Sequence, residues 1–258
     1  MTADPLLNSA TIDPKEYAIF NNISSVWWDP KGEIRALHYI SSLITPFILK
    51  EIVNAGLPKK EFVNTTTPLK GLEILEVGCG GGLLTEKIGS FGCNLTAIDI
   101  NSELIEVAKH HATLNPSLTN INYRLEAVED HVLQNTKKYD VVITNFVLEH
   151  VQDQELFLRI CIKCLRPGGS LIVSSIGQTW MGWFFGIILP EFILSKIPRG
   201  MHEYDKFITI EETQKLLEKY KCRTTSTRGL RYGIIGEPWI WIDSTSMFYI
   251  LHAVKSHY

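Results

Sequence analysis

The sequence predicts an α/β fold built on a mostly parallel sheet of seven strands. From Leu72 onwards, apolar runs of strand length alternate with stretches of helical periodicity, which is the pattern of successive β-α-β units. A glycine-rich turn follows the first of these strands, where folds of this class bind nucleotides. The length of 258 residues fits a single domain of this kind with additional segments.

The N-terminal part, residues 1–70, is expected to form a helical cap and a linker. Apolar residues follow helical spacing through 13–56, and the loop Trp27-Trp28-Asp29-Pro30-Lys31-Gly32 interrupts this pattern. Residues 57–70 are polar and rich in proline and threonine, which is typical of a linker.

Residues 71–175 should form the parallel core of the sheet. Helices are expected over 83–91, 102–114 and 153–165, and the five strands have the sequences LEILEV, LTAIDI, INYRLE, YDVVITNFV and SLIVSSI. Because ligands of such sheets bind beyond the carboxyl ends of the strands, the functional residues should lie in the loops that follow them.

Residues 176–208 break the alternation. Their segment TWMGWFFGIILPEFILSKIP is strongly apolar, but Pro190 and Glu191 interrupt it, and it is too short and broken to span a bilayer. Residues 209–258 are expected to complete the domain with a helix over 210–221 and closing strands over 222–232 and 245–255.

Charge and cysteine content exclude two classes of protein. A net charge of −3 argues against broad nucleic-acid binding, which needs clustered positive charge. Five cysteines do not form a disulfide framework in a chain of this size. Cys161 and Cys164 form a CxxC pair within a helical pattern, which favours buried thiols over metal or redox use.

The segment from Glu76 to Gly82, EVGCGGG, follows a strand and opens a helix. Its glycines allow a sharp turn and a close approach by a ligand, and Asp99 ends the next strand, where it can accept hydrogen bonds from ribose hydroxyls. A dinucleotide fingerprint starting at Gly78 would need glycine where Leu83 stands, and no P-loop motif is present. A structural turn without a ligand is the alternative.

An acid two residues before the first glycine resembles the first motif of class I S-adenosylmethionine-dependent methyltransferases, which have a Rossmann-like fold. The resemblance implies that residues 71–175 bind this cofactor and that Glu76 contacts its methionine amino group. It also implies cofactor contacts along the strand ends, by Gly78, Gly80, Asp99, Ile100, Ala127, Val128 and Asn145.

Glu149 and His150 stand side by side just beyond the fourth strand, on the expected cofactor side. An imidazole with a near-neutral pKa suits a general base that removes the acceptor's proton. Glu149 then orients His150 or holds a metal ion. The alternative is that both residues cap the following helix.

A more specific resemblance covers nearly the whole chain. WWD with Gly32 and Leu37-His38, then EVGCGGGLLTE, LEHV, RPGGSL, and IPRG with His202 and Lys206-Phe207, occur in that order. Together they resemble the O-methyltransferases of ubiquinone biosynthesis. The resemblance implies methylation of a catechol-type hydroxyl on a polyprenylated ring, and it makes a quinone-synthesis complex a candidate partner.

The chain departs from that family at several positions. In that family, the pattern Glu-x-x-Glu-His is associated with a divalent metal. Phe146 occupies the first position of the pattern here, so Glu149 and His150 remain as the two candidate Mg²⁺ ligands. Ile44 stands where the family has a cofactor-contacting arginine, and Met201 replaces a threonine. Because of these departures, one alternative is that the chain is a weakly active subunit of a quinone-synthesis complex. Another is a different small-molecule or lipid methyltransferase, since the core motifs fit that class as well.

The apolar segment 180–197 matches an insertion that contacts membrane in this family. Lys196 and Arg199 would suit lipid headgroups, and the apolar surface is expected to consist of Trp180, Trp183, Phe184, Phe185, Ile187, Ile188 and Leu189. The expected location is the matrix side of the mitochondrial inner membrane, as a peripheral protein, or else the cytoplasmic face of a bacterial membrane. A buried lid is the alternative for this segment.

Overall fold

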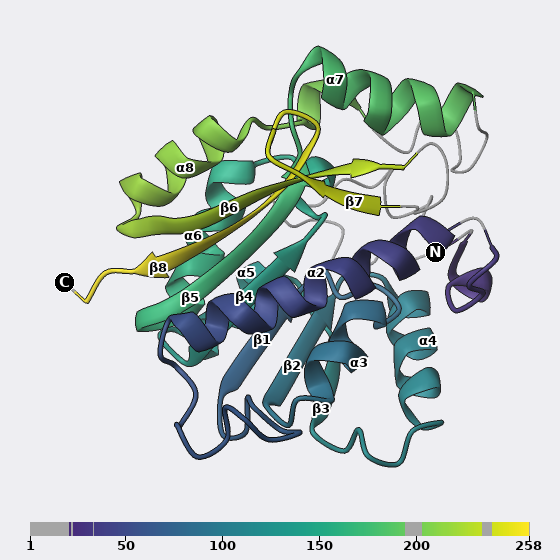
Figure 1. Cartoon of the computed structure of the whole chain (residues 1–258). Helices are drawn as coiled ribbons and strands as arrows, with labels where there is room; N and C mark the ends of the chain where they lie inside the picture. Colours follow the sequence, from purple (N-terminus) through teal and green to yellow (C-terminus); the bar gives the residue numbers. More distant parts are fainter. Residues whose placement is uncertain (1–20, 22, 33, 194–202, 234–238, 258) are drawn as a thin grey trace.

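The computed structural model describes residues 21, 23–32, 34–193, 203–233 and 239–257 (Figure 1). Its single sheet has eight strands in the order β3-β2-β1-β4-β5-β8-β6-β7. The first five strands in this order run parallel, and β8 lies antiparallel between β5 and β6. The strands are β1 Glu73–Val77, β2 Asn94–Asp99, β3 Ile121–Leu125, β4 Tyr139–Asn145, β5 Leu165–Ile176, β6 Cys222–Tyr232, β7 Trp239–Ile242 and β8 Phe248–Lys255.

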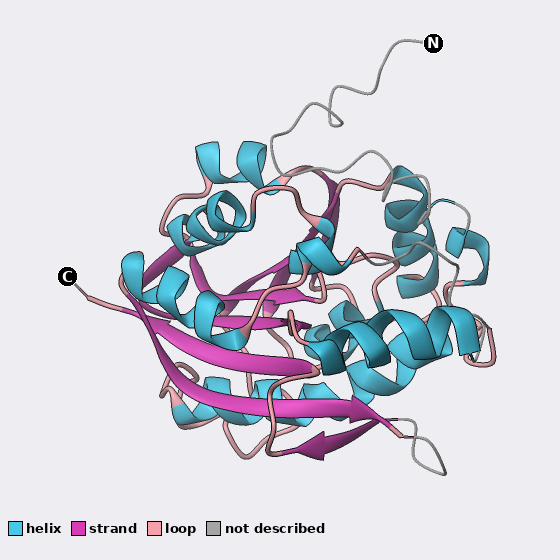
Figure 2. Cartoon of the chain, turned by 90° about the horizontal axis from the view of Figure 1, so that it is seen from above, coloured by secondary structure: helices cyan, strands magenta, loops and turns pink. Residues whose placement is uncertain are grey.

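Helices cover both faces of the sheet, as the β-α-β pattern predicts (Figure 2). One face packs against α2 (Arg35–Asn54), α3 (Leu83–Gly89) and α4 (Ser102–Ala112), and the other against α5 (Val128–Gln134), α6 (Gln154–Cys164) and α8 (Ile210–Lys219). Figure 1 shows α2 lying across the front of the sheet. Alternating strand residues explain the two cores, because Phe248 and Ile250 enter the α2 side while Tyr249 and Leu251 enter the α6 side.

Side-chain caps fix where several helices begin. Asn101 and Asp153 each accept a hydrogen bond from the third residue of the following helix, at α4 and α6 respectively. Thr209 and Glu212 form a reciprocal capping box at the start of α8. The helices at the carboxyl edge are therefore anchored by local sequence as well as by packing.

The expected fold is confirmed, with three differences in its elements. The sheet has eight strands where seven were predicted, because Trp239–Ile242 adds β7 at the edge, paired with β6. The predicted elements also omitted α5, and β5 begins at Leu165, before the Pro-Gly-Gly turn. All four residues of β7 are half-buried, so the strand shows neither the alternation nor the full burial that sequence patterns detect.

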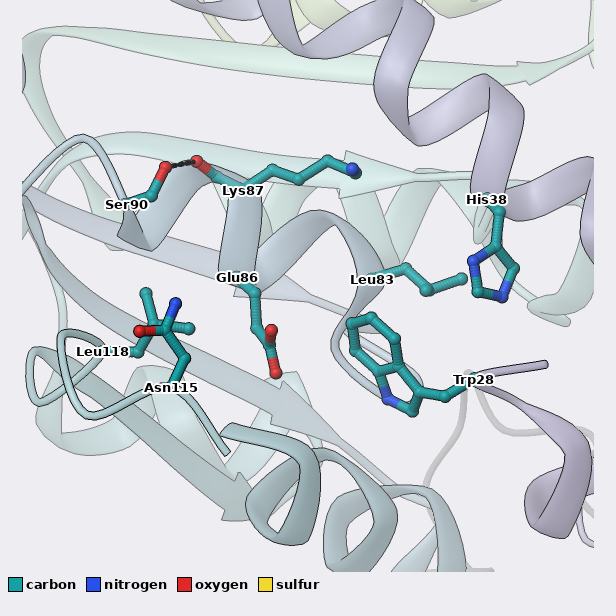
Figure 3. Close-up of a pocket in the computed structure, with 8 residues that line it drawn as sticks. All are labelled: Trp28, His38, Leu83, Glu86, Lys87, Ser90, Asn115 and Leu118. Atoms are coloured by element: carbon teal, nitrogen blue, oxygen red, sulfur yellow. Dashed lines mark hydrogen bonds between the residues drawn. The ribbon is translucent and has the colours of Figure 1, made fainter. Parts of the chain in front are cut away.

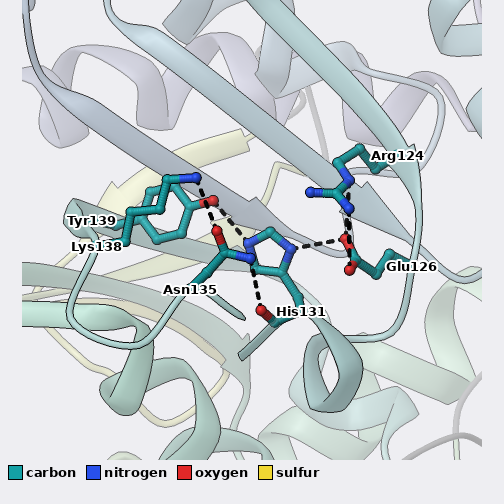
Figure 4. Close-up of polar contacts among 6 residues, drawn as sticks. All are labelled: Arg124, Glu126, His131, Asn135, Lys138 and Tyr139. Atoms are coloured by element: carbon teal, nitrogen blue, oxygen red, sulfur yellow. Dashed lines mark hydrogen bonds and ion pairs between the residues drawn. The ribbon is translucent and has the colours of Figure 1, made fainter. Parts of the chain in front are cut away.

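A buried polar network fastens the unexpected helix α5 to the sheet (Figure 4). His131 is fully buried, with Nδ1 2.8 Å from Oε2 of Glu126 and Nε2 2.8 Å from the Tyr139 hydroxyl. Burial lowers the pKa of His131, although hydrogen bonding to Glu126 opposes this change. Because both ring nitrogens have partners inside the fold, the network accounts for this histidine structurally.

Helix α2 is long and apolar enough to cross a membrane, judged by length and composition alone. In this fold its residues Ile40, Ile44, Ile48 and Ile52 are buried in the core beside α3. All five cysteines are free and buried, which confirms the interpretation of Cys161 and Cys164 as core thiols.

Candidate functional site

The glycine loop turns away from β1 at the carboxyl edge of the sheet. The amides of Gly78 and Cys79 both donate to the Ile98 carbonyl of β2, at 2.9 and 3.1 Å. Gly80 and Gly82 have φ values of +53° and +90°, in the left-handed region that favours glycine. The loop therefore has the predicted conformation, and β1 and β2 hold it in place.

Asp99, at the end of β2, is tied to this loop. Its Oδ2 accepts from the Gly80 amide at 2.8 Å, and its Oδ1 accepts from the Asn101 amide at 2.9 Å. Burial raises the pKa of Asp99, and these backbone hydrogen bonds oppose the rise. The sequence predicted a ribose acceptor, and the structure adds a second role as the anchor of the glycine loop.

Glu76 is a buried carboxylate at the start of the loop, with 2% of its surface exposed. Its Oε2 has no hydrogen-bond partner among the residues that the structure describes. Burial raises the pKa of Glu76 to about 8; the Thr85 hydroxyl opposes the rise and the charge of Asp99 adds to it. An unsatisfied buried carboxylate oxygen is what an ammonium group would complete, so Glu76 fits the methionine end of the cofactor.

The other predicted cofactor residues also lie at the carboxyl edge. Ile100 follows Asp99 and is partly exposed, whereas Ala127 and Val128 are buried at the start of α5, where Val128 packs in the core. Asn145 ends β4, and its Oδ1 accepts from the Ser174 hydroxyl at 2.6 Å. The topology thus brings these residues to one edge of the sheet, with the Val128 side chain turned inward.

Phe146, directly after β4, has a φ of +55°, which is unusual for a bulky residue. Its ring packs at 6.3 Å from that of Phe248, on the α2 side of the sheet. The next residue, Val147, lies so close to Gly78 that a Cβ built on the glycine would be 2.4 Å from a Val147 methyl. This strained turn brings the loop after β4 against the glycine loop.

Glu149 and His150 lie on the short helix η3 (Leu148–His150). Glu149 is 1% exposed, and its Oε2 accepts from the Ser175 hydroxyl of β5 at 2.8 Å. His150 is partly exposed. Glu149 therefore fastens the turn to β5, and His150 is the more accessible of the two. They do not cap α6, because Asp153 takes that position.

The described residues do not fit a three-ligand metal site. They contain no group of three or more histidine, cysteine, aspartate or glutamate side chains placed to hold a metal ion. Phe146 packs on the α2 side of the sheet. Glu149 accepts a hydrogen bond from Ser175, which is paired with Tyr249 of the α6 core, so Glu149 is held on the opposite side. Two candidate ligands remain, and one of them is buried against β5.

Ile44 is fully buried within α2 and packs in the core, so it has no role like that of the arginine it replaces. Lys196, Arg199 and Met201 lie outside the described residues.

Sequence reasoning missed the contact between the N-terminal cap and the glycine loop. Trp27 packs on Gly80 and Gly81, where a built Cβ would lie 2.6 and 2.3 Å from its ring. The Trp28 indole nitrogen donates to the Gly81 carbonyl at 2.9 Å. The absence of a side chain at Gly80 and Gly81 therefore allows tryptophan to pack on the loop, in addition to the predicted approach of a ligand. In the sequence, only the resemblance carried by the WWD motif pointed to this segment.

A pocket of about 280 Å³ opens beside Trp28, on the outer side of α3 (Figure 3). Its lining comprises Trp28, His38, Leu83, Glu86, Lys87, Ser90, Asn115 and Leu118. None of the predicted site residues lines it, so this pocket is distinct from the edge where Glu76, Asp99 and His150 lie.

Comparison with known proteins identifies relatives along most of the chain. The methyltransferase domain family model matches residues 75–173. The mitochondrial ubiquinone biosynthesis O-methyltransferase of Rattus norvegicus is 34% identical over 249 residues, which cover 96% of this chain and 71% of the rat protein. The ubiquinone biosynthesis O-methyltransferase of Rhodopseudomonas palustris is 34% identical over 232 residues, with 90% and 89% of the two chains covered.

Solved structures share the fold at lower sequence identity. The magnesium protoporphyrin IX methyltransferase of Synechocystis PCC 6803, with bound SAH, aligns with a TM-score of 0.62 and 16% identity. The alignment covers 93% of this chain and 99% of that one. This likeness supports the Rossmann-like methyltransferase fold.

Proposed function

Because the chain belongs to the ubiquinone biosynthesis O-methyltransferase family, we propose that it methylates a catechol-type hydroxyl on a polyprenylated ubiquinone precursor. It is an S-adenosylmethionine-dependent O-methyltransferase. The observation that carries the use of the cofactor is the buried, unsatisfied carboxyl oxygen of Glu76 beside the glycine loop that Asp99 anchors. The similarity to the ubiquinone O-methyltransferases supports the choice of acceptor. The acceptor would bind next to this loop, where η3 presents His150.

The cofactor supplies an electrophilic methyl group on a sulfonium, so the protein's task is to align the acceptor in line and remove its proton. Glu76 would balance the positive charge of the methionine end, and Asp99 would accept hydrogen bonds from the ribose hydroxyls. His150 takes the proton from the acceptor hydroxyl as the oxygen attacks. Glu149, held by Ser175, fixes the turn that carries His150.

Two alternatives follow from particular features of the chain. Methylation of a different small molecule or lipid needs the same loop, and Glu76 and Asp99 do not discriminate between acceptors. A weakly active subunit of a quinone-synthesis complex is favoured by Phe146 and Ile44, which replace polar residues of the family and are packed in the core. The acceptor assay below distinguishes all three functions.

The test is transfer of a labelled methyl group to a short-tailed catechol, compared with lipid acceptors, with and without chelator. We expect the catechol to be methylated at the hydroxyl, and activity to survive chelation because the described residues lack a three-ligand metal set. Methylation of lipid alone would favour the first alternative. Cofactor binding without transfer to any acceptor would favour the second.

We further propose that the insertion between β5 and α8 binds a membrane surface. It forms α7 (Trp180–Trp183) and the π-helix η4 (Phe184–Ile193). The backbone of η4 continues through Pro190 and Glu191, where the apolar run of the sequence is interrupted. Ile187 is buried in the core, which corrects its assignment to the apolar surface, whereas Trp180 and Trp183 are 70% and 44% exposed. The segment thus has an inner face packed against the core and an outer face with two exposed indoles.

Exposed indoles suit the boundary between headgroups and acyl chains. At about 25 cal/mol per Å² of apolar surface removed from water, two tryptophans would contribute several kcal/mol. A peripheral position of this kind, on the matrix side of the mitochondrial inner membrane or the inner face of a bacterial one, would give the site direct access to a tailed substrate.

Replacing both Trp180 and Trp183 by serine should therefore greatly reduce co-sedimentation with anionic liposomes. The matched control is Leu114→Ser with Leu133→Ser. Leu114, in the loop after α4, is 67% exposed, and Leu133, on α5, is 78% exposed, so both are exposed apolar residues outside the insertion. Equal sedimentation of the wild type and both double variants would mean that α7 and η4 serve only as a lid.

A further inference from the structure

Trp28 makes two contacts that join separate parts of the fold. Its indole nitrogen donates to the Gly81 carbonyl, 53 positions along the chain. Its ring stacks on the imidazole of His111, with ring centroids 3.3 Å apart and an interplanar angle of 1°. His111 lies at the C-terminal end of α4, so Trp28 connects the N-terminal cap, the glycine loop and α4.

A carboxylate holds His111 in this position. Nδ1 of His111 lies 2.7 Å from Oε1 of Glu86 on α3, and the two side chains are 29% and 13% exposed. Figure 3 shows Glu86 and Trp28 beside the same stretch of α3. The stacked ring cannot slide freely under Trp28 while this contact is made, so the indole N–H stays aimed at the Gly81 carbonyl.

The cap segment, residues 23–32, also packs on the loop itself. Trp27 is 5% exposed and lies against Gly80 and Gly81, and its carbonyl is 2.8 Å from Nε2 of His38 on α2. Gly80 is also the residue whose amide binds Asp99. The cap thus contacts the same backbone that the proposed cofactor would approach.

We propose that Trp28, His111 and Glu86 form a latch that keeps the cap segment closed over the glycine loop, and that the cofactor leaves only after this latch opens. Trp28 is a positioning residue, because it acts on the cofactor through the Gly81 carbonyl. The inference rests on the proposed use of S-adenosylmethionine, but it does not depend on which acceptor is methylated.

The test measures cofactor dissociation by stopped-flow displacement, together with KM for the cofactor and kcat. Trp28→Phe retains a ring over His111 but removes the N–H donor. The loss of one hydrogen bond should speed dissociation and raise KM by about threefold to tenfold, with kcat nearly unchanged. His111→Ala should have a similar effect, and His110→Ala, an exposed neighbour on the same helix, is the matched control.

Melting temperatures separate positioning from general stability. We expect Trp28→Phe to melt close to the wild type while it releases cofactor faster. Wild-type dissociation rates in both Trp28→Phe and His111→Ala would overturn the latch and leave the proposed function standing. A wild-type protein that binds no cofactor would overturn the proposed function, and the latch with it.

Discussion

His150→Ala should reduce methyl transfer by about a hundredfold to ten-thousandfold, the usual contribution of a positioned general base. The loss should appear in kcat, because His150 acts on the acceptor's proton while Glu76 and Asp99 hold the cofactor. The difference in kcat between His150→Ala and the wild type should also decrease as the pH rises, since a catechol that ionises in solution no longer needs a base.

Three measurements test the assignment of His150 as the general base. Cofactor affinity by calorimetry should match the wild type, which shows that the loop is intact. His110→Ala, at an exposed position on α4, should retain full activity. Activity of His150→Ala within a few fold of wild type at neutral pH would mean that the proton leaves by another route, and that η3 only shapes the acceptor site.

Asp99→Ala should have the second large effect, on cofactor binding. Two ribose hydrogen bonds to a carboxylate contribute roughly 2–4 kcal/mol, which corresponds to about 30- to 1000-fold in affinity. The same substitution removes the acceptor of the Gly80 and Asn101 amides, so the free loop also loses its anchor. We therefore expect a loss at the upper end of that range, with some loosening of the loop.

Asp99→Asn separates the role in the loop from the role in cofactor binding. The single carbonyl oxygen of asparagine can accept from only some of the donors, which are the Gly80 and Asn101 amides and the two ribose hydroxyls. Its affinity should lie between those of the wild type and Asp99→Ala. Asp130→Ala removes an exposed acid on α5 and should bind normally. Near wild-type affinity in Asp99→Ala would show that this carboxylate serves the loop alone.

The sequence was sufficient to predict that Glu76, the glycine loop and Asp99 lie together, because the signals for their placement are local. Glu76, the glycines and Asp99 lie on consecutive β-α-β elements, whose parallel pairing brings strand ends to one edge. The fold class was predicted from the alternation of strand-length apolar runs with helical stretches. The sequence did not show that Glu149 and Phe146 lie on opposite sides of the sheet. Their positions depend on distant residues, because Glu149 bonds the Ser175 hydroxyl while Phe146 packs with Phe248.

The remaining differences come from long-range contacts. Nothing near Trp28 in the sequence indicates Gly81 or His111 as its partners, since these contacts depend on how the cap returns to the core. Strand β7 lies at the sheet edge, and Trp239 bonds the Ala36 carbonyl of α2, so tertiary packing supports it more than local propensity does.

The most direct test of the account is the proton balance of cofactor binding at pH 7. In the protein without cofactor, burial raises the pKa of Glu76 to about 8, so this carboxyl group is mostly protonated at pH 7. The cofactor's ammonium group would stabilise the carboxylate, lower that pKa and release the proton. Calorimetry in buffers of different ionisation enthalpy should show most of one proton released by the wild type, and that release should be absent in Glu76→Gln, which should also bind more weakly. The same proton balance and affinity in both proteins would contradict the placement of the cofactor on Glu76.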